Sequence, residues 1–286
     1  MNIAINTDYF EDVNSPELYI RLAAEAGFTH MMWCHHWNTD FVYSSPEIAQ
    51  IKQWLNTYGI QLQDVHGTDG KEKCWYSEEE YRRKAGVELV INRILMLKEL
   101  DATGTLVMHP PRFNVSDTPE KTALTTRRAV SIRRTLDELM PFLQKYDVKI
   151  SLENLPHGNW EILSGLLDDY PAEQIGFCFD SGHCNIAIRQ HYTESEKYAS
   201  RIIALHLHDN DGSDDLHQSP FTGTFNWEWL AEVLKKADYS MPLNFELNQR
   251  RSPFYHPEKS DHTDDLRAFL ADAKERCEKF AGMCAK

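Results

Sequence analysis

The sequence lacks several features that would place it in other protein classes. No stretch reaches the roughly 18 consecutive apolar residues that a membrane span requires, and the N-terminus MNIAINTDYFED has no basic segment followed by an apolar one. Six cysteines are scattered along 286 residues without a C-x-x-C pair, which fits reduced thiols better than a disulfide framework or a zinc ribbon. We therefore expect a cytoplasmic protein that does not contact membranes.

Basic charge is scarce relative to acidic charge. Lys and Arg together number 30 against 44 Asp and Glu, which gives a formal net charge of −14. Proteins that neutralise many phosphates usually present a basic face, so this balance argues against a nucleic-acid partner. With 42% hydrophobic and 26% charged residues, the composition is that of a globular protein with a substantial core. We expect a small-molecule ligand, and a homo-oligomer is compatible with the composition.

Linkers rich in Gly and Ser are also absent, which favours one domain over residues 1–286. Short apolar runs alternate about eight times with longer stretches of helical periodicity. The expected strands are 2–6, 30–34, 60–66, 105–109, 148–154, 175–180, 202–208 and 242–248. This alternation predicts an α/β fold, a single (β/α)8 TIM barrel. A doubly wound open sheet is the rival, but NIAINTDYF lacks the Gly-rich turn of its nucleotide-binding forms.

Recognisable signals mark the starts of several helices. Ser15, Ser45 and Thr118 each begin a Ser-Pro-Glu or Thr-Pro-Glu sequence, which predicts an N-cap followed by Pro in the first helical turn. Within the third of these helices, Pro141 is expected to cause a kink or a restart. The segment 261–280 has the apolar spacing of a helix packed on a core.

Imidazoles and carboxylates recur at the ends of the expected strands. They are His66, His109, Glu153, Asp180, His206 with His208, and Glu246. Each has an ordinary structural explanation alone, but in a TIM barrel all strand ends meet at the rim where active sites form. Carboxylates gathered there repel, and imidazoles stay desolvated, unless a cation joins them. The N and O donors predict a divalent metal, Zn²⁺ or Mn²⁺, and Co²⁺, Fe²⁺ and Mg²⁺ also fit.

The sequence HLHDNDGSDD surrounds the end of the seventh expected strand. His206 and His208 share one face because side chains alternate along a strand. His206, the deeper of the two, is the better candidate for a metal ligand, and His208 for a supporting or substrate-contacting group. The aspartates that follow, taken alone, are more typical of a solvated acidic turn.

Several motifs, in this order, resemble those of the xylose isomerase-like barrel superfamily. They are DVHG at 64, MHP at 108, LEN at 152, FDSGH at 179, HLHDNDG at 206, DLH at 215 and FEL at 245, and they span essentially the whole chain. The superfamily includes sugar phosphate isomerases and epimerases and the endonuclease IV type of apurinic-site nuclease. For the isomerases and epimerases, the resemblance implies one divalent ion held by Glu153, Asp180, His206 and Glu246, with His183 contacting the substrate.

The nuclease branch of this superfamily holds three zinc ions with a larger ligand set. This chain resembles it at every position of that set, namely His66, His109, Glu153, Asp180, His183, His206, Asp215, His217 and Glu246. Nine candidates exceed what one ion of four to six ligands can use. The alternative function is therefore an endonuclease IV-like multinuclear zinc phosphoester hydrolase, and a barrel that only binds sugar is a third alternative.

The first expectation is an isomerase or epimerase of a small sugar or sugar phosphate that works through an enediolate. A metal would bind the carbonyl and the adjacent hydroxyl of the substrate and acidify the C–H between them. Glu153 and Glu246 would be the catalytic groups that remove and return the proton. Further candidates for substrate contact are His183, His208, Arg112 and Arg250, because guanidinium grips a phosphate or carboxylate with two hydrogen bonds.

Two departures from the relatives concern the substrate. The segment DNDGSDD lacks the Arg that ketose 3-epimerases of the superfamily carry a few residues after the strand 7 His. The turn before Trp227 has Gly223 alone, where many relatives have Pro-Gly-x-Gly, so the loop over the site is expected to differ. The aromatic segments 34–38 and 74–76 are candidates for an apolar wall against a sugar ring.

Overall fold

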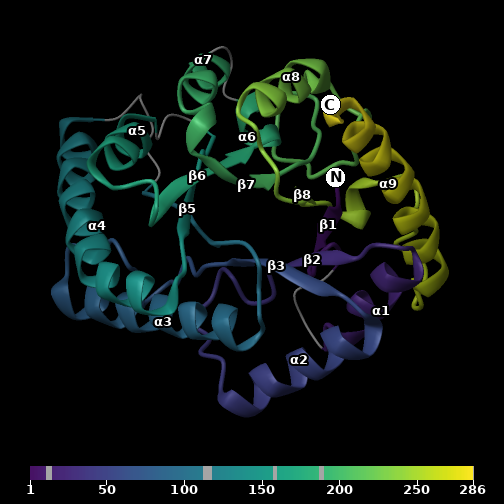
Figure 1. Cartoon of the computed structure of the whole chain (residues 1–286), viewed down its shortest axis with the longest axis horizontal. Helices are drawn as coiled ribbons and strands as arrows, with labels where there is room; N and C mark the ends of the chain where they lie inside the picture. Colours follow the sequence, from purple (N-terminus) through teal and green to yellow (C-terminus); the bar gives the residue numbers. More distant parts are fainter. Residues whose placement is uncertain (11–14, 112–117, 157–159, 187–189, 286) are drawn as a thin grey trace.

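Eight parallel strands form the centre of the fold. In this computed structural model, which describes residues 1–10, 15–111, 118–156, 160–186 and 190–285, each strand pairs with the next along the chain and the first pairs with the last. The strands are β1 (Ile3–Asn6), β2 (His30–Trp33), β3 (Gln61–His66), β4 (Leu106–Met108), β5 (Ile150–Glu153), β6 (Ile175–Asp180), β7 (Ile202–His206) and β8 (Leu243–Phe245). Figure 1 shows them at the middle of a ring of helices.

A parallel contact between the last two strands closes the barrel. Leu207, directly after β7, forms a bridge with Phe245 of β8. Its N–H donates to the carbonyl of Asn244 at 2.9 Å, and its carbonyl accepts from the N–H of Glu246 at 3.1 Å. The predicted single (β/α)8 TIM barrel is confirmed.

Helices fill the connections between the strands and cover the outside of the barrel (Figure 1). The described helices are α1 (Glu17–Glu25), α2 (Ser45–Tyr58), α3 (Glu80–Glu99), α4 (Pro119–Tyr146), α5 (Trp160–Asp169), α6 (Ser181–Ile186), α7 (Gln190–Lys197), α8 (Trp227–Lys236) and α9 (Thr263–Cys284). Two short 3₁₀ turns, η1 (Ala199–Arg201) and η2 (Gln249–Arg251), precede β7 and follow β8. A helix follows every strand, as the alternation in the sequence predicts.

Helix starts differ from the expectation by one residue in two of three cases. Thr118 is the N-cap of α4, with Pro119 at the first helical position. The N-cap of α1 is Pro16 rather than Ser15, and that of α2 is Ser44 rather than Ser45. Ser44 is the N-cap because Glu47 lies three residues after it and completes a capping box, in which the backbone N–H of Ser44 donates to the Glu47 carboxylate at 2.7 Å.

Pro141 does not end or restart α4, so the expectation of a restart was wrong. The helix is continuous from Pro119 to Tyr146, and Pro141 lies within its last two turns on the exposed side. Buried Leu136, Leu139 and Leu143 flank it and pack into the core. Packing of this apolar stripe on the barrel therefore outweighs the loss of one helical hydrogen bond.

Buried side chains form two separate groups. A large apolar core lies between the helices and the outer face of the strands. Inside the barrel, Val107, Cys178 and Ala204 of β4, β6 and β7 form a small cluster of their own and are completely buried. Each lies two residues before a strand-end polar group, so side-chain alternation directs His109, Asp180 and His206 to the same interior.

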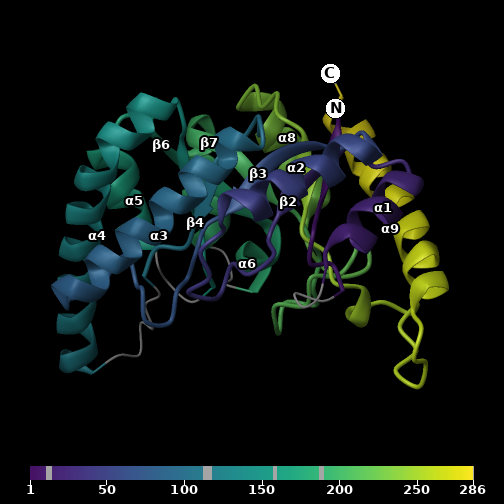
Figure 2. The same cartoon turned by 90° about the horizontal axis from the view of Figure 1, so that it is seen from below.

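Opposite ends of the barrel have different roles. Figure 2 shows both chain termini on the side opposite to α6, the short helix that directly follows β6. The carboxyl ends of the strands, and with them the side chains described next, lie on the α6 side. None of the described helices combines the length and apolarity needed to cross a bilayer.

Candidate metal centre

Four buried side chains converge at the carboxyl ends of successive strands. Glu153 is the last residue of β5, Asp180 of β6 and His206 of β7, while Glu246 directly follows β8. Their exposed fractions are 1%, 0%, 0% and 8%. We call these four residues the strand-end cluster.

Distances within the strand-end cluster are those of groups that share a small space. Nδ1 of His206 lies 3.0 Å from a carboxylate oxygen of Glu153 and 2.9 Å from one of Glu246. Donor atoms of Asp180, His206 and Glu246 all lie within 4.8 Å of one another, and so do those of His66, Glu153 and His206. The expected ligands therefore meet at one place.

Residues around this cluster hold it from two sides. Nδ1 of the His183 ring lies 3.0 Å from a carboxylate oxygen of Glu153, and the backbone N–H of His183 donates to the Asp180 carboxylate at 2.6 Å. On the other side, Nε2 of His109 lies 3.2 Å from Glu153. The ring of His109 also stands edge-on to that of His66, with centroids 4.8 Å apart.

A second group gathers around Asp215. Its carboxylate lies 3.2 Å from Nε2 of His183, 3.2 Å from Nε2 of His217 and 3.5 Å from Nε2 of His208. Donor atoms of His208, Asp215 and His217 all lie within 4.8 Å of one another, and we call these three residues the Asp215 cluster. His208 also lies 3.2 Å from Asp180, so the two clusters adjoin.

The backbone at His217 is held in an unusual conformation. Its φ of 48° lies in the left-handed region that non-glycine residues rarely adopt. Its ring Nδ1 is 3.1 Å from the carbonyl of Glu246, and its own carbonyl accepts from the N–H of Asn248 at 2.8 Å. Such strain persists where surrounding contacts fix it, and it is common at functional sites.

The strand-end cluster fits a divalent cation. Nδ1 of the completely buried His206 lies 3.0 Å from a carboxylate oxygen of Glu153 and 2.9 Å from one of Glu246, so two buried carboxylates meet at one nitrogen. Buried carboxylates that lie this close together repel unless a cation joins them, and carboxylate and imidazole donors are those that Zn²⁺ and Mn²⁺ accept. The residues present therefore suit the predicted kind of ion.

Electrostatics at the site leave carboxylates charged and some imidazoles neutral. Burial, and then the neighbouring His109 and His206, lower the pKa of His66 to about 4, so its ring is neutral near pH 7 and keeps a lone pair. Although burial opposes it, His206 together with His217 holds the pKa of Glu246 well below its usual range. Asp215 raises the pKa of His217 to about 10 against the effect of burial.

Trp37 provides an aromatic wall beside the strand-end cluster. Its half-buried ring lies 4.7 Å from that of His66 and 5.2 Å from that of His109, centroid to centroid. Of the second expected aromatic segment, Trp75 is 1% exposed and packs against Gly86 of α3. Trp75 therefore belongs to the core and cannot form the wall, which corrects the expectation for that residue.

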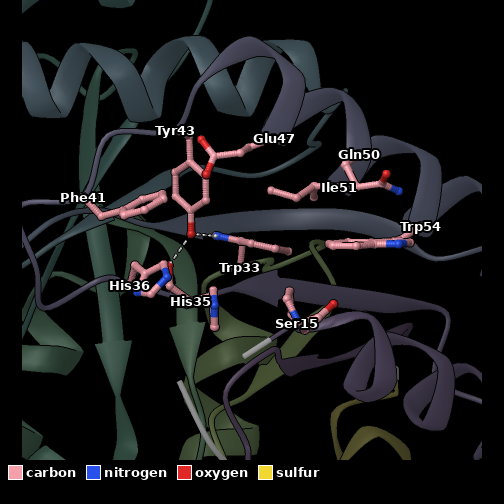
Figure 3. A pocket seen from close by; sticks show the side chains of 11 residues that line it. Ser15, Trp33, His35, His36, Phe41, Tyr43, Glu47, Gln50, Ile51 and Trp54 are labelled. Carbon is pink, nitrogen blue, oxygen red and sulfur yellow. Dashed lines mark hydrogen bonds between the residues drawn. The ribbon is translucent and has the colours of Figure 1, made fainter. Parts of the chain in front are cut away.

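His35 and His36 of the segment 34–38 line a separate cavity of about 240 Å³ between the start of α1, α2 and the loop after β2. Figure 3 shows His35 and His36 at its edge with the rings of Trp33, Phe41 and Tyr43. Tyr43 donates to the His35 carbonyl at 2.7 Å and accepts from Trp33 at 2.9 Å. None of its lining residues belongs to the strand-end cluster or the Asp215 cluster.

The aspartates after β7 do not form a uniform solvated turn. Asp211 and Asp214 are exposed, but Asp209 is completely buried, and Asp215 is the centre of the histidine group described above. Asp209 accepts hydrogen bonds from the N–H groups of Asn210 and Phe225 and from Nε1 of Trp227. The solvated turn that these aspartates suggest when taken alone is therefore wrong for Asp209, which anchors the loop that carries Asp215 and His217.

Arg250 and Arg251 lie in η2, which follows β8. Arg112 lies outside the described residues. The Arg250 guanidinium stands over the ring of Phe10 at 4.8 Å and over that of Tyr255 at 5.9 Å. Arg251 is exposed in η2.

Asn154 was missed in the sequence analysis, although it directly follows Glu153 in the LEN motif. Its side chain is completely buried and bonds to the backbone of Asp180. An amide directly after a buried strand was the signal available, but Asn is also a common turn residue.

Comparisons with known proteins agree with this geometry. The sequence profile of a family described as xylose isomerase-like TIM barrel matches residues 20–273. The uncharacterized protein y4fM of Sinorhizobium fredii is 27% identical over 253 residues, which cover 80% of each chain.

Solved structures share the fold over nearly their whole length. A D-tagatose 3-epimerase-like protein superposes with a TM-score of 0.76 at 23% identity, covering 99% of this chain and 98% of the other. A D-allulose 3-epimerase from Methylomonas sp., solved in complex with D-allulose, gives 0.71 at 16% identity and covers 98% and 96%. At such identities the likeness establishes the fold.

Proposed function

The chain belongs to the xylose isomerase-like TIM barrel family, and from this premise we propose that it is a divalent-metal-dependent isomerase or epimerase of a small sugar or sugar phosphate. The observation that carries the proposal is the convergence of Glu153, Asp180, His206 and Glu246 from consecutive strands. Solved structures with the same fold include enzymes that act on D-allulose and related sugars.

The metal-binding role falls to the strand-end cluster. Asp180, His206 and Glu246, together with Glu153, would hold the ion, because these buried donors face one another. When bound, a divalent ion polarises a carbonyl and its neighbouring hydroxyl and so acidifies the C–H between them. Zn²⁺ and Mn²⁺ are the first choices for this donor set.

Glu153 and Glu246 are the groups that move the proton. Each places a carboxylate oxygen within 3.0 Å of the same nitrogen of His206, and they come from β5 and from the end of β8. Neighbouring imidazoles outweigh burial and lower the pKa of both groups, so both are ionised near neutral pH and can accept a proton. One carboxylate removes the proton from the substrate carbon to give an enediolate and later releases that proton to solvent. The other takes a proton from solvent and delivers it to the opposite face of the enediolate.

Other residues orient the substrate. His183 lies 3.0 Å from Glu153 and is positioned to hold a substrate oxygen near that carboxylate. Trp37 offers an apolar surface beside His66 and His109, which suits the C–H face of a sugar. His208, Arg112 and Arg250 remain candidates for contacts with the rest of the substrate.

Exchange of a substrate proton with solvent tests this function. Chelator-treated protein reloaded with Mn²⁺ or Zn²⁺ should introduce deuterium from D₂O next to the carbonyl of at least one sugar in a panel of ketoses, aldoses and their phosphates. Glu246→Gln should lower the exchange rate by about 10²–10⁴-fold, because a proton-transfer group contributes that much. The control is Glu232→Gln on the exposed face of α8, which should leave the rate unchanged.

Two results would contradict the proposal. One is that the metal-loaded protein introduces deuterium into none of the sugars in the panel. The other is exchange that survives in Glu246→Gln, which would exclude Glu246 as the essential proton-transfer group.

The Asp215 cluster supports a second candidate, a multinuclear zinc phosphoester hydrolase. His208, Asp215 and His217 share no residue with the group formed by Asp180, His206 and Glu246, so the two groups could bind separate ions. Metal analysis separates the candidates, since about one ion per chain supports the isomerase and two or three support the hydrolase. The net charge of −14 argues against a nucleic-acid substrate for the latter.

A further inference from the structure

Three side chains at the rim of the barrel extend the pairing between neighbouring strands. Asn6, Asn154 and Ser181 each make two hydrogen bonds to one residue across a strand seam, accepting from its N–H and donating to its C=O. We call these three residues the rim staples. All three are at most 3% exposed, so water does not compete for these bonds.

The side chain of Asn154 continues the pairing of β5 with β6 beyond the last well-formed backbone hydrogen bonds. The last register pair is Glu153 with Cys178, and the next backbone bond, from Asn154 N–H to the Cys178 carbonyl, stretches to 3.4 Å. The Asn154 side chain then accepts from the Asp180 N–H at 2.7 Å and donates to the Asp180 carbonyl at 2.9 Å. Its own carbonyl lies 2.9 Å from Nδ1 of His183.

Ser181 and Asn6 act in the same way at two other seams. Between β6 and β7, the Ser181 hydroxyl donates to the His208 carbonyl at 2.7 Å and accepts from the His208 N–H at 2.8 Å. Between β8 and β1, Asn6 donates to the Leu247 carbonyl at 3.1 Å and accepts from its N–H at 2.9 Å. Leu247 is the residue after Glu246.

These staples surround the strand-end cluster. At the β7–β8 seam the backbone of Leu207 makes the corresponding bonds itself. The four consecutive seams from β5–β6 round to β8–β1 are therefore each tied by such a pair of bonds at the rim. Strands of a barrel tilt and twist, and a side chain can span a gap that backbone groups no longer reach.

The backbone around the strand-end cluster must be held in place because the carboxylates of the cluster repel one another. Glu153 and Glu246 place carboxylates on the same nitrogen of His206, and like charges repel unless an ion lies between them. We propose that the rim staples are positioning residues that hold the backbone beneath Asp180, Glu246 and His208, so that the metal ligands are in place before an ion binds. This inference rests on the metal site of the proposed function.

The chain contains a matched control for such a staple. Asn92 of α3 donates to the carbonyl of Tyr43 at 2.8 Å and accepts from its N–H at 2.9 Å. This is the same pair of bonds as at Asn154, but it holds the loop before α2. Loss of it should affect folding without affecting the cluster.

The test compares Asn154→Ala with Asn92→Ala. Chelator-treated proteins are titrated calorimetrically with Mn²⁺ and with Zn²⁺, and their unfolding by urea is followed without metal. Asn154→Ala should weaken metal binding about 10–100-fold, the loss seen when groups that orient metal ligands are removed, while Asn92→Ala should bind as wild type does. The absorption spectrum of the Co²⁺ form should change only for Asn154→Ala.

A second measurement does not depend on metal. In the metal-free protein, hydrogen exchange in the peptide covering residues 178–184 should be faster in Asn154→Ala than in Asn92→Ala at equal global stability. Should Asn154→Ala not fold, Ser181→Ala tests the inference with the same measurements, with exchange followed in the peptide around His208.

The outcomes separate this inference from the function. If wild type binds metal and Asn154→Ala binds it equally well with an unchanged Co²⁺ spectrum, the staples are merely structural and the inference is wrong. Equal weakening by Asn92→Ala leads to the same conclusion. If wild type binds none of the three ions, the proposed function itself fails and the inference fails with it.

Discussion

At the scale of single residues, the site depends on how closely side chains and backbone approach each other. Gly182 follows Asp180 by two residues, in α6, and its Cα faces the ring of His208. A methyl group there would overlap with ring atoms of His208, which is completely buried and has little room to move. Glycine is therefore required by contact and not by backbone angle at this position.

Gly182→Ala should push the His208 ring away from Asp180 and Asp215 and lower the free energy of unfolding by about 1–3 kcal/mol, as overpacking of a buried site does. Urea denaturation at pH 7 measures this change. Gly282→Ala is the control, because nothing lies within 4 Å of the added methyl on α9 and alanine favours helix by up to about 1 kcal/mol. Equal stability of Gly182→Ala and wild type would show that the His208 ring is free to shift.

Sequence patterns predict well which side chains lie at the rim of the barrel. They predict less well which hydrogen-bond partners these side chains have. Alternation along a strand directs His206 and Asp180 to the same interior, and both lie there. Asn154 and Asp209 could not be singled out, since Asn and Asp are ordinary turn residues. Their buried bonds to Asp180 and Trp227 depend on how strands and loops diverge in space.

At the scale of elements, the loop between β7 and α8 carries the Asp215 cluster and its own buried anchor. It contains the Asp215 cluster's acid and the left-handed His217, and Asp209 is its anchor to the start of α8. The Asp209 carboxylate satisfies donors from Phe225 and Trp227 that are themselves buried. From the sequence, this loop is expected to differ from that of relatives with a Pro-Gly-x-Gly turn. The Asp209 carboxylate anchors the same loop.

Asp209→Asn should destabilise the protein by about 1–3 kcal/mol, because the amide replaces one acceptor oxygen by a donor and leaves a buried N–H without a partner. The free energy of unfolding from urea curves measures this loss. The exposed Asp211 accepts two local bonds, both from Ser213, so Asp211→Asn should change this free energy by less than about 0.5 kcal/mol. Equal effects of the two changes would contradict the anchoring role.

Element boundaries show where local signals compete with packing. The order of strands and helices follows from periodicity alone, and all eight expected strands are present. The cap of α2 shifts to Ser44 because only that residue has Glu47 at the right spacing. Pro141 does not interrupt α4 because Leu139 and Leu143 pack on the core on either side of it, and the sequence does not reveal how strongly a helix is held.

At the scale of the whole molecule, the fold brings the three acids of the strand-end cluster together on one side of the barrel. The strand-end cluster comes from β5 to β8, whereas β1 to β4 contribute His66, His109 and the adjoining Trp37 wall. The carboxylates of the strand-end cluster therefore come from one half of the barrel, and the aromatic wall comes from the other. This asymmetry suits an ion held on one side and a sugar held against the other.

Removal of metal should therefore reduce the stability of the entire barrel. Without an ion, Glu153, Asp180 and Glu246 remain buried with imidazoles as their ion-pair partners among the described residues, and an ion that binds only the folded state adds about 2.7 kcal/mol at a concentration 100-fold above its Kd. Differential scanning calorimetry should show Tm rising by several degrees when Mn²⁺ or Zn²⁺ is restored to chelated protein.

Asp180→Asn should abolish this rise, because an amide replaces a carboxylate ligand of the strand-end cluster, while Asp211→Asn on the exposed loop should retain it. The comparison distinguishes binding at the cluster from general screening of the net charge of −14, which would stabilise both variants alike. A Tm that does not depend on metal in the wild type would mean that the buried carboxylates are stabilised by the imidazoles alone, and the cluster would then be a structural network of ion pairs.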